Sequence, residues 1–126
     1  MENRPINKNK PILAINIVAE ILGVHQRTLR IYDEEGLLVP ERNKQNRRLY
    51  SFNDIEKGEF IQFMTRSIGV NLVGVKIILY LLGEMKISKS DYLNKAKKMA
   101  KAIGYDHNCR EEIREKLIKR GRSKAK

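Results

Sequence analysis

The stretch from Gly23 to Tyr50 constrains the fold more than any other part of this 126-residue chain. It reads GVHQRTLRIYDEEGLLVPERNKQNRRLY: an Arg-bearing helical segment ends at a glycine, and two short strand segments follow around a polar turn. A new helix start comes directly afterwards. This order predicts a mainly α fold built on a helix-turn-helix with a two-stranded β-hairpin wing. Such a fold places one helix in the major groove of DNA and cations on the flanking phosphates.

Helical periodicity and capping residues place the remaining elements. Asn16 and Asn71 are good N-caps, and Ser51 followed by Asp54 resembles a capping box. The first helix is expected to turn its apolar residues inward, namely Ile17, Val18, Ile21 and Leu22. The expected elements are an extended segment at 12–15, helices at 17–22, 26–35, 53–67, 71–82 and 90–103, strands at 37–42 and 47–50, and a polar helical segment at 110–120.

The positive charge is concentrated in the C-terminal third of the chain. The formal net charge is +11, yet residues 11–85 hold nine Lys/Arg and nine Asp/Glu, whereas residues 86–126 hold fourteen and five. A positive field of that kind raises encounter rates with polyanions and adds a salt-sensitive contribution to binding. We therefore predict a disordered basic arm at 1–10, a winged DNA-binding domain at 11–85, and a basic helical segment at 86–126 that serves dimerisation, non-specific DNA contact or both.

Charge order along the second helix predicts which of its ends meets DNA. Cationic and amide side chains occupy its first half, while residues 33–35 are all acidic and oppose the helix dipole. That arrangement suits a helix whose first turns enter the groove. Gln26 and Arg27 are the predicted base readers, because Arg matches guanine O6/N7 and Gln matches adenine N6/N7. The alternative is a solvated helix face, and His25 in particular is equally explained as a helix cap.

These residues resemble the N-terminal DNA-binding domain of the MerR family of bacterial transcription regulators. The resemblance covers about two thirds of the chain, and the segments at 23–25 and 69–75 look most like the HspR heat-shock repressor branch. The matching motifs are Ile15, Val18-Ala19, Leu22-Gly23-Val24, Thr28-Leu29-Arg30-Ile31-Tyr32-Asp33, Gly36-Leu37-Leu38-Val39-Pro40-Glu41-Arg42 and Arg48-Leu49-Tyr50.

The resemblance implies that Arg30 lies near a backbone phosphate and that Arg48 is the wing arginine. Ile31 departs from the pattern, where an aromatic residue is common, and Asn46 and Arg47 stand where a glycine and an aromatic residue are frequent. A differently shaped wing turn is therefore expected, and surface solubility is the alternative for Lys44 and Arg47. The candidate DNA contacts are His25, Gln26, Arg27, Thr28, Arg30, Tyr32, Arg42, Lys44, Arg47, Arg48 and Tyr50.

Catalytic, metal and membrane functions are not favoured. A structural zinc site needs four ligands, and the C-terminal region offers only His107 and Cys109, so a composite site across a dimer is the alternative to an incidental thiol. No Ser/His/Asp set, Gly-rich phosphate loop or carboxylate pair is present, and we predict neither an enzyme nor a cofactor. No apolar run reaches membrane-spanning length, and the N-terminus lacks the apolar core of a signal peptide, which favours a cytoplasmic chain.

The fifth helix is the predicted dimer contact. Its apolar stripe consists of Tyr92, Ala96, Met99 and Ile103, and it ends at Gly104 after about two heptads. The alternative is that this helix folds back on its own domain.

We expect a MerR-type winged helix-turn-helix regulator that binds an inverted repeat in double-stranded DNA as a homodimer. The resemblance implies repression of chaperone or stress genes by occlusion of RNA polymerase, with a chaperone as co-repressor. Some relatives instead activate promoters. The alternatives are an architectural, excisionase-like DNA-binding protein and a module whose basic tail docks an acidic protein partner.

Overall fold

The computed structural model describes residues 7–105 and 117–118, and these form five α-helices and three short strands. Most of the helical segment expected at 110–120 lies outside the described residues. The elements are β1 (Leu13–Ala14), α1 (Ile15–Leu22), α2 (Gln26–Glu34), β2 (Glu41–Arg42), β3 (Arg48–Tyr50), α3 (Phe52–Gln62), a π-helical turn η1 (Phe63–Ile68), α4 (Leu72–Glu84), a 3-10 turn η2 (Lys89–Asp91) and α5 (Tyr92–Ala102).

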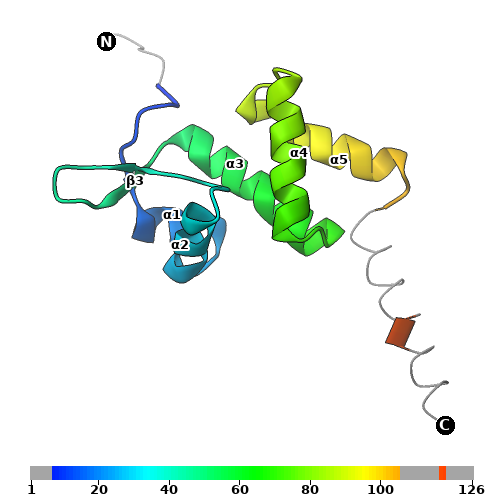
Figure 1. The fold of residues 1–126 in the computed structure, drawn as a ribbon, viewed down its shortest axis with the longest axis horizontal. Coiled ribbons are helices and arrows are strands. Elements are labelled where there is room, and N and C mark those ends of the chain that lie inside the picture. The colour runs from blue at the N-terminus through cyan, green and yellow to red at the C-terminus, as the bar shows by residue number, and fades with distance from the viewer. Residues whose placement is uncertain (1–6, 106–116, 119–126) are drawn as a thin grey trace.

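The sheet has one strand more than the predicted hairpin. β3 is its central strand and pairs antiparallel with β2 and with β1, so that Leu49 lies opposite both Glu41 and Ala14. The β2–β3 hairpin projects from one end of the molecule as the wing (Figure 1). The first predicted strand is shorter than expected. Leu37 and Leu38 are both buried in a turn after Gly36, and both of their N–H groups donate to the Tyr32 carbonyl.

The first helix begins earlier than predicted and buries a narrower face. It starts at Ile15 after an Ala14 cap, so Asn16 lies inside it and does not cap it. Val18 and Leu22 are buried as predicted, but Ile17 and Ile21 are 41% and 53% exposed. These two isoleucines lie one turn apart on a neighbouring face of the helix, outside the contact that α1 makes with α2 and α3.

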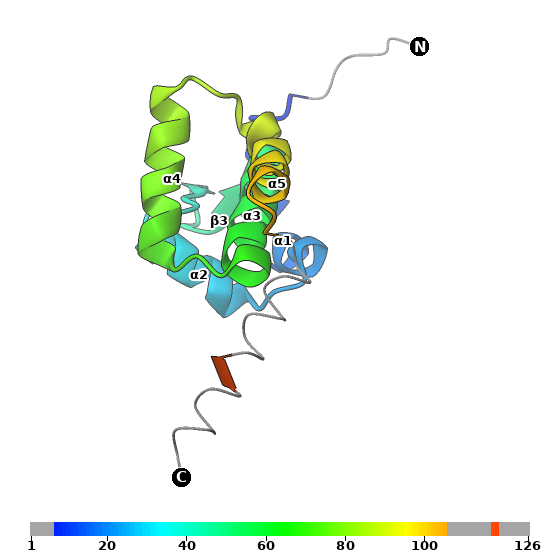
Figure 2. The same ribbon diagram turned by 90° about the vertical axis from the view of Figure 1, so that its right-hand side faces the viewer.

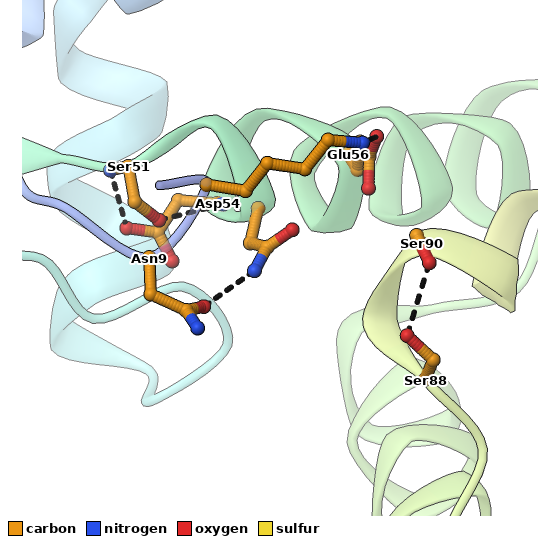
Figure 3. Close-up of polar contacts among 8 residues, drawn as sticks. Asn9, Ser51, Asp54, Glu56, Ser88 and Ser90 are labelled. Carbon is orange, nitrogen blue, oxygen red and sulfur yellow. Dashed lines mark hydrogen bonds and ion pairs between the residues drawn. The ribbon is translucent and has the colours of Figure 1, made fainter. Parts of the chain in front are cut away.

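Capping residues fix the starts of α3 and α4 as predicted. The Asp54 N–H donates to Ser51 Oγ at 3.1 Å, and the Ser51 N–H donates to Asp54 Oδ2 at 2.9 Å (Figure 3). Asn71 Oδ1 accepts from the Gly74 N–H at 2.8 Å. Local sequence is sufficient for these contacts because each capping side chain reaches a backbone group only three residues away.

Residues 7–10, which the sequence analysis assigned to a disordered arm, form a turn that contacts α3. The Asn53 N–H donates to the Lys8 carbonyl at 3.0 Å, and Lys8 Nζ lies 3.3 Å from Glu56 Oε1. The side chains of Asn53 and Asn9 are also hydrogen-bonded (Figure 3). Residues 1–6 lie outside the described part of the chain.

The two C-terminal helices flank α3 differently. α5 packs directly on α3, where the rings of Tyr92 and Phe60 meet edge to face with centroids 5.6 Å apart. α4 stands on the other side of α3 and runs across it (Figure 2). Tyr92 and Ala96 are buried within the protomer, so the prediction that they form a dimer contact is wrong. α5 folds back on its own domain, and α3 covers these two residues, whereas Met99 and Ile103 of the same stripe are 45% and 74% exposed.

Within the described part of the chain, none of the helices combines the length and the apolar character that crossing a membrane requires.

Candidate nucleic-acid interface

The first turns of α2 form an exposed, cationic surface. His25 precedes the helix in an extended conformation and makes no side-chain cap, so the capping alternative for this residue is not met. Its imidazole is exposed, as is the Arg27 guanidinium, while Gln26 and Thr28 are half-buried. Together with Ile31 they line an open hollow of about 570 Å³ on the outer side of the helix. The N-terminal half of α2 is therefore accessible from the solvent.

A second hollow, of about 440 Å³, connects α2 with the wing and the start of α1. Arg30, Arg47 and Arg48 line it, together with Asn16 in the first turn of α1. Backbone N–H groups at a helix N-terminus and clustered guanidinium groups both favour an anionic oxygen. The predicted contacts of the helix and of the wing thus meet at one anion-suited surface. The N-terminal turn of α1 was missed in the sequence analysis, which treated it only as a helix start.

The wing is attached to α2 by one shared carboxylate. Arg48 Nε donates to Asp33 Oδ2 at 2.8 Å, and Arg42 Nη2 donates to the same oxygen at 3.4 Å. The Asp33 side chain is only 15% exposed and that of Arg48 20%, so this contact is shielded from water. Both arginines are predicted DNA contacts. The geometry gives them a further role, which is to hold the wing hairpin against the recognition helix.

Another acid at the end of α2 is also paired inside the molecule. Glu35 Oε2 lies 2.9 Å from Lys76 Nζ of α4. The sequence predicts that the first turns of this helix enter the groove but does not show which residues pair with the acids at its end. Two of the three acids at the end of α2 are therefore paired within the molecule, Asp33 with the wing and Glu35 with α4.

Asparagine side chains organise the tip of the wing. Asn43 Oδ1 accepts the N–H groups of Gln45 at 3.0 Å and Arg47 at 2.9 Å. Asn46 adopts a φ of 61°, a left-handed conformation that asparagine tolerates better than most residues. Its carbonyl accepts from Arg42 Nη1 at 3.1 Å. The turn is therefore ordered without the glycine that is frequent in relatives, and Lys44 and Arg47 remain exposed on it.

Two of the predicted DNA contacts are core residues. Tyr50 is fully buried, and its hydroxyl has no hydrogen-bond partner among the described residues; burial raises its pKa to about 12. Tyr32 is 6% exposed, and burial raises its pKa although Arg66 and a hydrogen bond with Thr65 oppose the shift. The prediction of a DNA contact is wrong for Tyr50, whose ring lies in the hydrophobic core. The Tyr32 hydroxyl is directed toward Thr65 of η1.

The described residues contain no group of three or more His, Cys, Asp or Glu side chains placed to hold a metal ion. His107 and Cys109, the candidates for a composite metal site, lie outside the described residues.

Comparison with known proteins identifies related sequences over the winged domain and most of α4. Residues 13–82 match the family described as MerR HTH family regulatory protein. A Streptomyces coelicolor protein named heat shock protein HspR is 37% identical over 76 residues, which are 60% of this chain and 50% of that protein. The regulator GlnR of Bacillus cereus is 36% identical over 74 residues, 59% of this chain and 57% of that protein. The chain thus matches only about half the length of these relatives.

A solved structure shares the fold over most of the chain. It is HiNmlR, a MerR family regulator that lacks the sensor domain and was crystallised with promoter DNA. The match has a TM-score of 0.52, covers 90% of this chain and 93% of that one, and has 21% sequence identity. At that identity the likeness concerns the fold alone.

Proposed function

The chain belongs to the MerR family of helix-turn-helix regulatory proteins, and from that premise we propose that it represses stress or chaperone genes by binding an inverted repeat as a homodimer. The observation that supports the DNA-binding part is the pair of hollows lined by exposed arginines, one at the first turns of α2 and one between α2, the wing and the start of α1. The identity with an HspR protein supports the choice of target genes. Repression follows where the bound dimer occludes RNA polymerase, with a chaperone as co-repressor.

Within this proposal, each part of the surface has its own task. Gln26 and Arg27 enter the major groove and read base edges. Arg30 and Arg47 lie on the side where α2 faces the wing and bind backbone phosphates, which orient the protein but carry no sequence information. The basic residues after 105 add salt-dependent, non-specific contacts.

The proposal is tested by footprinting the full chain on DNA upstream of its own gene and of chaperone genes. Arg27→Ala should weaken operator binding by about 1–3 kcal/mol and random-DNA binding far less. Arg47→Ala is the matched control, because it removes the same exposed guanidinium from the wing and should weaken both DNAs nearly equally. Equal losses for Arg27→Ala on both DNAs would remove Arg27 from base reading and favour an architectural DNA-binding protein.

A further inference from the structure

One apolar side chain of α2 is exposed on the same face as a predicted base reader. Ile31 is 38% exposed, whereas Leu29 and Tyr32 of the same helix are buried. It follows Arg27 by four residues, so the two side chains lie one turn apart on one face of the helix. Both line the open hollow outside the first turns of α2. Ile31 therefore belongs to the accessible side of this helix and not to the core.

The side chains that surround Ile31 in this hollow are polar, namely those of His25, Gln26, Arg27 and Thr28. A single exposed isoleucine on a protein surface needs no functional explanation. This one, however, lies on a helix whose first turns enter the major groove under the proposed function. Once they do, Ile31 is brought against the base edges together with Arg27, and its exposed surface must meet a group of the DNA.

The major groove offers one apolar group to such a side chain, the C5-methyl of thymine. The other groups at the base edges are hydrogen-bond donors or acceptors. An isoleucine packed against one of those would displace water from a polar group without replacing its hydrogen bond, which costs free energy. Contact with a methyl group instead removes apolar surface of both partners from water. Ile31 is therefore complementary to thymine and to no other standard base of DNA.

We propose that Ile31 is a specificity-determining residue that packs against a thymine methyl group in the operator, beside the bases read by Gln26 and Arg27. This inference rests on the proposed function and names a base preference within it. Gln26 and Arg27 select adenine and guanine by hydrogen bonds. Ile31 adds a preference that hydrogen bonds do not supply. Because the family commonly carries an aromatic residue at this position, the preference belongs to chains with an aliphatic residue there.

The test uses the duplex that the footprint defines, made once with thymidine and once with deoxyuridine, which lacks only the C5-methyl group. The full chain should bind the deoxyuridine duplex about fourfold more weakly for each methyl group that Ile31 covers, the effect expected for one buried group of that size. Deoxyuridine is then placed at one thymine at a time. The loss should map within about two base pairs of the Arg27 contact, because Ile31 lies about 6 Å further along the helix.

Variants of the chain identify the side chain responsible. Ile31→Ala should bind the thymidine duplex more weakly and reduce the ratio of the two affinities from about fourfold to nearly one. Ile21→Ala is the matched control, since it makes the same change at an exposed helical isoleucine of α1 that does not line the hollow. It should keep the full ratio. Thr28→Ser, which removes only a methyl group from the same hollow, should keep it as well. Circular dichroism confirms that each variant is folded.

The outcomes separate this inference from the proposed function. Equal affinities of the unmodified chain for the two duplexes, with the footprint present, would overturn the role of Ile31 and leave the proposed function standing. A ratio that survives Ile31→Ala would also overturn it, and loss of the ratio in Thr28→Ser would assign the methyl contact to Thr28 instead. A chain that protects no DNA segment would overturn the proposed function and this inference together.

Discussion

Two parts of the molecule, the winged half (residues 13–68) and the α4–α5 half (residues 72–102), expose different kinds of surface. The first exposes charged side chains on α2 and the wing, and the second exposes apolar side chains on α4 and α5. In the winged half, Asp33 and Glu35 are paired within the chain, while Arg27 and Arg47 are exposed. Its exposed apolar residues are spread over separate elements. In the α4–α5 half, the exposed apolar residues lie on successive turns of two helices and line one groove. The first surface suits a polyanion, and the second suits an apolar protein face.

The comparison shows that a balanced charge count can hide an ordered charge distribution. Residues 11–85 contain equal numbers of cationic and acidic residues, and the sum suggests no attraction to DNA. The structure separates the two signs, because the acids at the end of α2 face the wing and α4. Arg27 and Arg30, in the first half of α2, are both exposed to solvent.

The largest effect is expected where the two halves are joined. Phe60 is fully buried and packs against Tyr92, so Phe60→Ala should lower the free energy of unfolding by about 3–5 kcal/mol. Chemical denaturation measures the loss, and Tyr92→Phe, which keeps the ring, should cost far less. A single transition that splits into two would show that the halves fold separately. A loss below about 1 kcal/mol would contradict the view that this ring contact joins them.

An intermediate effect on DNA affinity is expected when the Asp33 carboxylate of the winged half is removed. Asp33→Asn removes the carboxylate that holds Arg48 and Arg42, a partly buried, charge-assisted contact of the kind that contributes about 1.5–3 kcal/mol. If Asp33 positions the wing, operator affinity should fall by about tenfold, although the lost negative charge favours binding to any DNA.

Glu34→Gln is the control for that measurement. It makes the same charge change on an exposed residue of the same helical turn, and it should strengthen binding to operator and random DNA alike. Titrations of both variants on both DNAs separate the two effects. Asp33 has no positioning role if Asp33→Asn behaves as Glu34→Gln does.

The smallest effect is expected at Tyr50, a fully buried residue at the end of the wing strand β3. Tyr50→Phe removes a buried hydroxyl without a partner among the described residues, so stability should stay equal or rise by up to about 1 kcal/mol. DNA affinity should be unchanged. The pKa of Tyr50 is about 12 in the folded chain against 10.0 ordinarily, so the folded state resists ionisation.

The pH dependence of stability tests the same residue. Its contribution is fully present below pH 10 and is lost as the pH rises through 12, because the unfolded chain ionises first. Thermal melts between pH 9 and 12 should therefore show a smaller alkaline loss of stability for Tyr50→Phe than for the unmodified chain. A weaker affinity of Tyr50→Phe for DNA would instead return Tyr50 to the interface.

The sequence predicted correctly those helix starts and ends that are determined by residues close together in the chain. Gly36 ends the α2 region with a φ of 70°, and Ser51, Asp54 and Asn71 cap the helices that follow them. The strand β1 was expected only as an extended segment, because its pairing with β3 joins residues more than 30 positions apart. The same limit applied to Asp33 and Arg48, whose contact requires the hairpin to fold back on α2.

Burial was predicted less well than element positions. An apolar stripe shows that a helix has a buried face but not what covers it, so the stripe of α5 was assigned to a partner although α3 covers Tyr92 and Ala96. In α4, more apolar residues are present than one face can bury, and the excess is what remains exposed. The roles of Gln26, Arg27 and the other exposed residues in binding DNA remain predictions.

The ion pair between Lys76 and Glu35 links α4 to the end of the recognition helix. Both side chains are more than a third exposed, and such pairs contribute about 1 kcal/mol or less. The pair is therefore a weak contact between the two helices and does not by itself fix their relative orientation. The end of α2 is therefore held only weakly against α4 at this contact. Higher ionic strength screens the pair, so the position of the C-terminal end of α2 relative to α4 should depend on the salt concentration.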